Sequence, residues 1–136
     1  MFVSGKCSWF GGPLDHGVAP DEGLAFIHDI NQAPFLFLSQ QPKGTTGLAR
    51  RLNPLVNYIA CRWDYEKTPS KMLLRRWALV HSKKTGVSLL AFPADWGPHE
   101  DTGRVADISL GAMRQLRIST DDIIDVTFPA TEELVA

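Results

Sequence analysis

The sequence has few of the residues that hold metal ions. Its only cysteines, Cys7 and Cys61, are far apart and lack the paired spacing of a structural zinc site. No two of the four histidines stand at a spacing typical of metal ligands. We therefore expect no bound metal and no cofactor. The cysteines are compatible with one disulfide or with two buried thiols, since a free cysteine packs as a small apolar residue.

Long hydrophobic runs are also absent. No stretch approaches the roughly 20 apolar residues that a membrane-spanning helix needs. The first ten residues contain Lys6 and no apolar run of the length found in a secretory signal, so we expect no signal peptide. The localisation stays open, and cytoplasmic synthesis with delivery to a cell wall by a virion or by lysis is compatible with this pattern.

What the sequence does contain predicts one small β-rich domain. With 136 residues, 44% of them hydrophobic, the chain can bury one core and is too short for two ordinary domains. Its 11 glycines and 9 prolines are spread along the chain, which favours many short elements joined by tight turns. We see no internal repeat and no linker, so we expect a single all-β domain over residues 1–136.

The charge is unevenly distributed along the chain. Residues 43–84 contain ten basic and two acidic residues, a net charge of +8, whereas the remainder has four basic and 13 acidic residues, a net charge of -9. A basic face of this kind could contact a polyanion or an acidic neighbouring protein, and the plainer alternative is a solvated surface. Nothing resembles an aromatic-interleaved RNA platform or a recognition helix, so we do not expect nucleic acid as a partner.

Short alternating or apolar runs predict the strands. We expect them over residues 6–10, 58–65, 75–81, 87–92, 104–108 and 121–129. Gly86 suits a hairpin connection between the third and the fourth, and Pro93 is expected to close the fourth. Residues 23–27 are predicted as a strand or short element, and residues 29–57 as an insert of uncertain structure.

A short helix is predicted near the C-terminus. Ser109 can cap it by accepting from the free N–H groups of its first turn. Leu110, Met113 and Leu116 fall on one face of about two turns, as residues of the core do.

The C-terminal half carries a motif order that resembles a known family. An Asp-x-Gly-Pro corner is followed by Gly-Arg-x-x-Asp-Ile-Ser, a short helix, an acidic turn and a strand, in residues 94–98, 103–109, 112–116 and 121–128. The opening KCSWFGGP, residues 6–13, is similar to the first strand of the same family. These segments, about a third of the chain, resemble the double-psi β-barrel domain of rare lipoprotein A and expansins. The resemblance implies a six-stranded double-psi β-barrel with one short helix after Asp107-Ile108-Ser109 and a long irregular insert.

The same resemblance implies a glycan site. In the related proteins a groove across the barrel binds glycan chains, and the aspartate of the Asp-[Ile/Leu]-Ser motif is the critical carboxylate. Carried over by motif, this residue is Asp107, the corner aspartate is Asp95 and the hydroxyl of the opening strand is Ser8. The aromatic residues beside these positions that could stack on sugar rings are Trp9, Phe10 and Trp96.

The chemistry of glycan cleavage suits a carboxyl group such as that of Asp107. Cleavage of a glycosidic bond needs a carboxylic acid whose pKa is raised by burial or by a like charge, and Asp95 is a candidate for that neighbour. Inverting hydrolysis needs a second carboxylate about 6.5–9.5 Å away, for which Glu22 and Asp64 are available without motif support. A lytic transglycosylase can use one carboxylate, because a hydroxyl of the sugar itself is the nucleophile.

Each assigned residue also has a structural interpretation. Asp95 is alternatively a turn residue that binds its own backbone, and Asp107 a residue that stabilises the free N–H groups of the following helix. Ser8 is alternatively an ordinary strand residue, and the aromatic residues could belong to the core. The segment IACRWDY also departs from the family, since Cys61 and Arg62 stand where lytic members have a histidine.

Two functions from different classes follow. The first is binding of a cell-wall glycan, peptidoglycan, with possible cleavage of the lytic-transglycosylase type, in which the basic 43–84 segment helps to hold an anionic polymer. The alternative is a non-catalytic assembly module, such as a phage tail or virion protein, whose bipolar surface contacts neighbouring subunits. A cysteine nucleophile at Cys61 is disfavoured, since the sequence shows no histidine paired with it.

Overall fold

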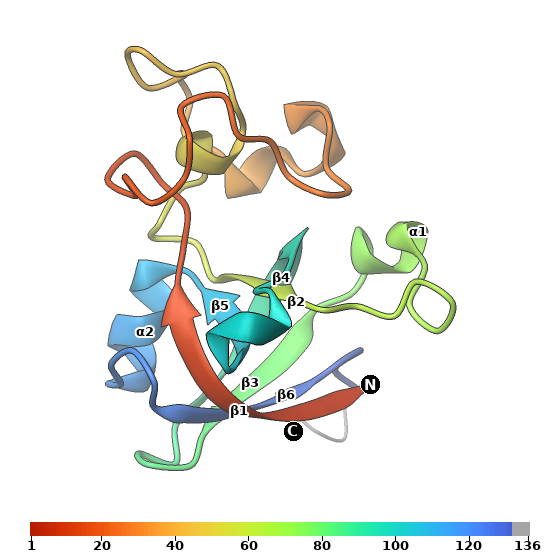
Figure 1. Cartoon of the computed structure of the whole chain (residues 1–136). Coiled ribbons are helices and arrows are strands. Elements are labelled where there is room, and N and C mark those ends of the chain that lie inside the picture. The colour runs from red at the N-terminus through yellow and green to blue at the C-terminus, as the bar shows by residue number, and fades with distance from the viewer. Residues whose placement is uncertain (132–136) are drawn as a thin grey trace.

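The computed structural model describes residues 1–131 and contains a closed barrel of six strands (Figure 1). The strands are β1 (Phe2–Trp9), β2 (Tyr58–Cys61), β3 (Ala78–Ser82), β4 (Ser88–Trp96), β5 (Arg104–Ile108) and β6 (Ile123–Thr127). Their order around the barrel is β1-β5-β2-β4-β3-β6. The fold class expected from the sequence, an all-β six-stranded barrel, is confirmed.

The strand pairing has an internal two-fold pattern. β1 pairs with β5 and β2 with β4 in parallel, while the other four pairs are antiparallel. Exchanging β1, β2 and β3 for β4, β5 and β6 leaves every pair and its direction unchanged. Closure of the barrel leaves no edge strand, which protects all six strands from pairing with other chains.

The short helix at the C-terminal end is confirmed. α2 (Leu110–Leu116) begins after Ser109, whose hydroxyl accepts a hydrogen bond from the Ala112 N–H. The helix buries Met113 and Leu116 as expected, whereas Leu110 is only half-buried. A second helix of one turn, α1 (Ser70–Leu73), was not predicted. Four single 3-10 turns complete the regular structure: η1 (Ile30–Gln32), η2 (Pro34–Leu36), η3 (Ala49–Arg51) and η4 (Glu100–Thr102). None of the helices in the described part of the chain has the length and apolar character to cross a bilayer.

Some strand bounds differ from those expected, since β1 already begins at Phe2 and β2 ends at Cys61. Two further expectations about strands are wrong. Residues 23–27 form no strand, and Pro93 does not end β4, which continues to Trp96. Pairing with β3 stops at Ala91, and on the other side the register with β2 shifts directly after Pro93. Because ladder hydrogen bonds are interrupted at such a shift, the missing N–H of a proline costs little there.

The whole segment between β1 and β2, residues 11–57, which includes the predicted insert 29–57 and is called the insert from here on, packs against the barrel and adds to its core. In Figure 1 the orange and yellow segments between β1 and β2 lie together beyond the end of β1. Their buried residues pack with Phe10 and Tyr58 of the barrel, and the Tyr58 hydroxyl donates to the Phe10 carbonyl at 2.7 Å. The apolar residues that the insert contributes to this core are Leu24, Phe26, Ile27, Ala33, Leu36, Phe37, Ala49 and Leu52.

The two cysteines are free buried thiols. Cys7 and Cys61 both pair with Ala106 of β5, one from each side, so a whole strand separates them. A gap of two strand spacings is about 10 Å, beyond the reach of a disulfide. Of the two alternatives that the sequence left open, the buried thiols are the correct one.

Candidate functional site

Four strands bring the motif residues into one row. Ser8 of β1 lies opposite Asp107 of β5, Asp107 lies opposite Ala60 of β2, and Ala60 lies opposite Asp95 of β4. Residues that are directly opposite share one face of a sheet. The fully buried Ile59 and Ile108 oppose each other one position away and fill the barrel interior. The row of Ser8, Asp107 and Asp95 therefore lies on the outer face of the barrel.

Asp107 is the carboxyl group with the most perturbed titration in this row. Burial raises its pKa from 3.8 to about 6, nearby Arg104 lowers it, and the charges of Asp15 and Asp95 raise it further. One carboxylate oxygen, Oδ1, is fully buried and accepts no hydrogen bond from residues 1–131. A buried oxygen without a donor stabilises the protonated form, so the carboxyl group is suited to exchanging a proton near pH 6.

Asp107 is not used as a helix cap. Ser109 occupies that position, and the Asp107 side chain makes no hydrogen bond with the first turn of α2 among the described residues. The structural alternative for Asp107 therefore has no contact that supports it.

Asp15 is the neighbouring acid that sequence reasoning missed. Its two oxygens accept from the N–H groups of Gly11, at 2.7 Å, and Gly17, at 2.9 Å, in the loop that leaves β1. Phe10 donates to the carbonyl of Ile108, the residue after Asp107, so this loop starts beside Asp107. The charge of Asp15 raises the Asp107 pKa more than the charge of Asp95 does. Its Asp-His-Gly context resembles an ordinary turn, and no motif in the sequence singled it out.

Asp95 anchors the insert to the barrel. Its Oδ1 accepts from the N–H of Ala25, at 2.7 Å, and from the N–H of Trp96, at 2.8 Å. The second contact is the local turn bond of the structural interpretation, and the first joins residues 70 positions apart. Burial raises the pKa of Asp95, and these two N–H groups lower it. Asp95 thus combines a structural role with a small electrostatic effect on Asp107.

The predicted aromatic residues differ in what they offer a ligand. Phe10 is buried and packs edge-on against Tyr58 with ring centroids 5.1 Å apart, so it is a core residue with little open surface. Trp9 is partly buried against the core. Trp96 is 41% exposed, and its indole N–H donates to the Trp63 carbonyl at 3.0 Å, which fixes the ring. Trp96 pairs with Cys61, so its side chain faces the opposite side of β4 from Asp95. Of the three, only Trp96 presents a large fixed aromatic surface.

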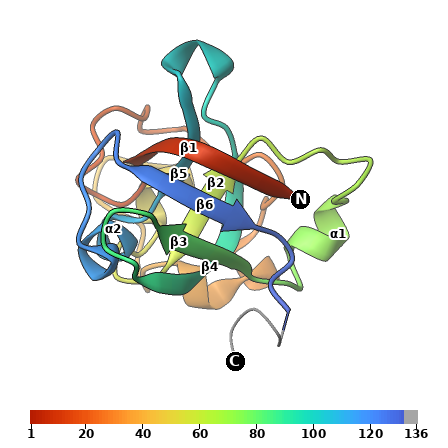
Figure 2. The same ribbon diagram turned by 90° about the horizontal axis from the view of Figure 1, so that it is seen from below.

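The departure at Arg62 has a structural explanation. Its guanidinium donates to the carbonyls of Pro98, at 2.7 Å, and Arg104, at 2.8 Å. These two carbonyls stand at the two ends of the η4 loop that leads into β5. Arg62 therefore holds the loop closed and sets where β5, with Asp107, begins. Figure 2 shows this loop projecting from the barrel.

The substitute acids considered from the sequence are not placed at Asp107. Asp64 accepts from the N–H of Glu66 at 3.1 Å in a local turn. Glu22 acts on Asp95 and raises its pKa, but it is not among the charges that perturb Asp107. Among residues 1–131 no group of three or more histidine, cysteine or acidic side chains is arranged to hold a metal ion.

The basic residues of the 43–84 segment do not form one uniform surface. Arg50 and Arg51 bind backbone carbonyls inside the insert. Lys83 and Lys84 form ion pairs with Asp125, at 3.7 Å, and with Asp122, at 3.4 Å. Part of the positive charge that the sequence suggested for a partner is therefore used within the molecule.

No family model and no curated protein matches the chain.

Proposed function

We propose that this protein binds a cell-wall glycan of the peptidoglycan type and cleaves it as a lytic transglycosylase, with Asp107 as its acid and base. The observation that carries the proposal is the state of Asp107: a half-buried carboxyl group on the outer face of the barrel, with a pKa of about 6 and one oxygen that is buried and has no partner in residues 1–131. A proton is gained and lost readily by such a group near pH 6.

The reaction needs only this one carboxyl group. Protonated Asp107 gives its proton to the glycosidic oxygen as the bond from the sugar carbon to that oxygen breaks. The resulting carboxylate takes the proton of a hydroxyl on the same sugar, whose oxygen forms the new bond to that carbon. Proton and electron pairs balance without a second carboxylate or water, and the product is an anhydro sugar.

The neighbouring acids bind the backbone. Both Asp15 oxygens accept backbone hydrogen bonds, and Asp95 Oδ1 accepts two. Their charges also raise the Asp107 pKa, which keeps a larger protonated fraction at neutral pH.

Ser8 of the same row suits a bound sugar. It lies directly beside Asp107 and carries a hydroxyl that can bind a sugar hydroxyl. Trp96 adds no aromatic surface to this row, because it pairs with Cys61 and faces the opposite side of β4 from Asp95.

The test is incubation of the protein with purified peptidoglycan and mass analysis of the soluble products. We expect anhydro-muropeptides from the unaltered protein and none from Asp107→Asn. Asp101→Asn is the matched control, because the Asp101 side chain is 92% exposed on the η4 loop. Reducing-end products in place of anhydro products would refute the transglycosylase mechanism, and products from Asp107→Asn would refute the assigned acid.

A second candidate function is the non-catalytic assembly module. Phe2, Thr127, Leu79 and Leu90 form a row across β1, β6, β3 and β4, and Phe2 and Leu90 are exposed. Among the elements of residues 1–131, none covers this side of the barrel in Figure 2. A neighbouring subunit would bury these residues, so concentration-dependent self-association in gel filtration is expected. A strict monomer at high concentration and low salt would contradict self-assembly.

A further inference from the structure

An exposed aromatic pair lies on the insert side of the barrel. Phe35 of η2 and Trp77, just before β3, stack with ring centroids 5.8 Å apart and an interplanar angle of 27°. Both pack edge-on against Phe92, at 4.9 and 5.3 Å. Phe92 is buried, but Phe35 is 47% exposed and Trp77 39% exposed. Anchoring of the insert explains the contacts with Phe92, and it leaves the exposed ring surface unexplained.

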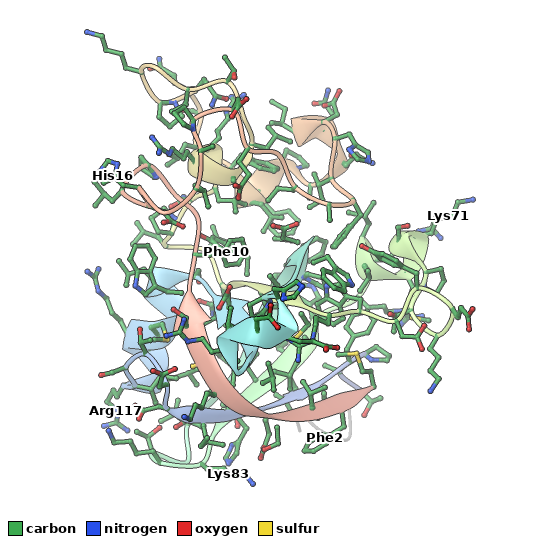
Figure 3. The ribbon with its side chains drawn as sticks, viewed as in Figure 1. Phe2, Phe10, His16, Lys71, Lys83 and Arg117 are labelled. Atoms are coloured by element: carbon green, nitrogen blue, oxygen red, sulfur yellow. The ribbon has the colours of Figure 1, made fainter. Side chains whose placement is uncertain are left out.

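Free positive charge lies close to Trp77 in the sequence. Arg75 and Arg76 directly precede Trp77 and are exposed, as is Lys71 of α1, which extends into solvent in Figure 3. Within residues 1–131, none of these three side chains makes an ion pair or a hydrogen bond with another residue, in contrast to Lys83 and Lys84. Their charges are therefore available to an anionic ligand.

The pair connects to the Asp107 row along β4. Phe92 pairs with Tyr58, and Asp95 pairs with Ala60, two positions further along β2. The extra residue at the register shift places Phe92 and Asp95 on the same face of the sheet. Three residues along β4 and two strand spacings across to Asp107 give a separation of about 14 Å between the Phe92 and Asp107 backbones. A ligand that spans this distance is a chain of several units.

We infer that Phe35 and Trp77, together with Arg75 and Arg76, form an accessory subsite for a distal part of an anionic glycan chain whose scissile bond lies at Asp107. This inference rests on the proposed function. The aromatic faces take the apolar faces of a sugar ring, and the guanidinium groups pair with carboxylates carried by the polymer. The subsite binds long strands more tightly than short fragments, because only long strands reach both places.

The arrangement of charge favours a glycan over single-stranded nucleic acid. Aromatic rings and arginines also bind nucleic acid, whose bases stack on such rings. Asp95, however, lies between Phe92 and Asp107 in the sheet, and Asp15 adds a further negative charge near Asp107. These carboxylates would repel a phosphate at every unit, whereas a polymer with carboxylates only at intervals can place its neutral rings near them.

The experiment measures binding in an Asp107→Asn background, which removes turnover. Isothermal titration uses soluble peptidoglycan strands, a neutral chitooligosaccharide and oligo-dT as probes. We expect Trp77→Ala to weaken binding of long peptidoglycan strands about tenfold, as loss of a central aromatic contact does. The double variant Arg75→Ser/Arg76→Ser should weaken it severalfold, with a smaller effect at high salt. Arg114→Ser/Arg117→Ser is the matched control, because it removes two exposed arginines at the end of α2, outside the 43–84 segment, and should bind normally.

The outcomes separate this inference from the proposed function. If thermal melting shows that Trp77→Ala is poorly folded, the test of the subsite rests on the arginine double variant alone. The two arginine side chains are exposed and unpaired in residues 1–131, so this variant should fold normally. Unchanged binding by the arginine variant, or tighter binding of oligo-dT than of peptidoglycan, overturns the subsite. In an otherwise unaltered background, the variants should lose cleavage of long strands and keep cleavage of short fragments. Loss of both, or absence of cleavage in the parent, counts against the proposed function itself.

Discussion

Asp107→Asn should make the folded protein more stable at alkaline pH while it abolishes cleavage. The pKa of Asp107 rises from 3.8 to about 6 on folding, chiefly through burial. A difference of one unit corresponds to 1.36 kcal/mol, so ionisation of this group opposes folding by about 3 kcal/mol at most. Partial exposure to water, and an amide that meets the same buried environment, reduce the expected gain to about 2 kcal/mol.

The sign of this effect depends on pH. Because the folded pKa lies above the unfolded one, the folded state holds the proton more tightly, and Asp107 does not oppose folding below about pH 4. The penalty grows between pH 4 and pH 6 and is complete above that window. An asparagine carries no charge at any of these values. The variant should therefore match the unaltered protein at pH 4 and exceed it in stability at pH 8.

Urea denaturation at a series of pH values measures this difference. The free energy of unfolding of Asp107→Asn minus that of the unaltered protein should rise from about zero at pH 4 to about 2 kcal/mol at pH 8, with equal m-values. Asp101→Asn, at an exposed position, should show no such rise. A difference that stays constant with pH, or a variant that is less stable at pH 8, would refute the reasoning and indicate that Arg104 stabilises the Asp107 carboxylate more than burial destabilises it.

Three further predictions concern other parts of the barrel. Gly11→Ala should lower the free energy of unfolding in urea by about 3 kcal/mol, because φ is +78° and a Cβ would lie 2.7 Å from a tyrosine hydroxyl. Gly86→Ala, at a φ of +75° in open space, should lower it by only about 1 kcal/mol. Equal losses for the two variants would contradict the steric clash at Gly11. Arg62→Ala should lower the free energy of unfolding by about 2 kcal/mol and reduce the rate of cleavage, because two loop carbonyls lose their hydrogen-bond donor. An unfolding curve that does not change would contradict the role of Arg62 in positioning the loop. Burial raises the pKa of the Cys7 and Cys61 thiols to about 12, so a thiol-labelling reagent at pH 8 should modify both only after unfolding, and rapid labelling of the folded protein would show that one is accessible.

Local patterns in the sequence located most of the barrel. The stretch 104–108 coincides with β5, and Ser109 caps the predicted helix. These succeed because strand alternation and helix capping depend on residues that are close in sequence. The prediction that Pro93 ends a strand failed for the opposite reason. Whether the missing N–H of a proline ends a strand depends on whether a neighbouring strand needs a donor at that position, and the register of β2 and β4 decides this.

The candidate site was predictable only in part. Motif order singled out Asp107 as a candidate, and Trp96 was chosen for its place in the same corner. Asp15 had no motif, because its importance comes from a loop that lies beside Asp107 only after β1 and β5 pair. Asp95 was seen as a partner of Asp107, whereas its main contact is the N–H of Ala25 in the insert.

The sequence by itself determined an all-β domain with a short capped helix, since composition and alternation restrict what each short segment can form. It also placed the acidic motif of Asp107. Only the tertiary structure decided that the cysteines stay apart, that the insert adds a core against Phe10 and Tyr58, and that Phe35 stacks on Trp77. These contacts join residues far apart in the chain, and their geometry is set by strand order and register, which no local pattern encodes.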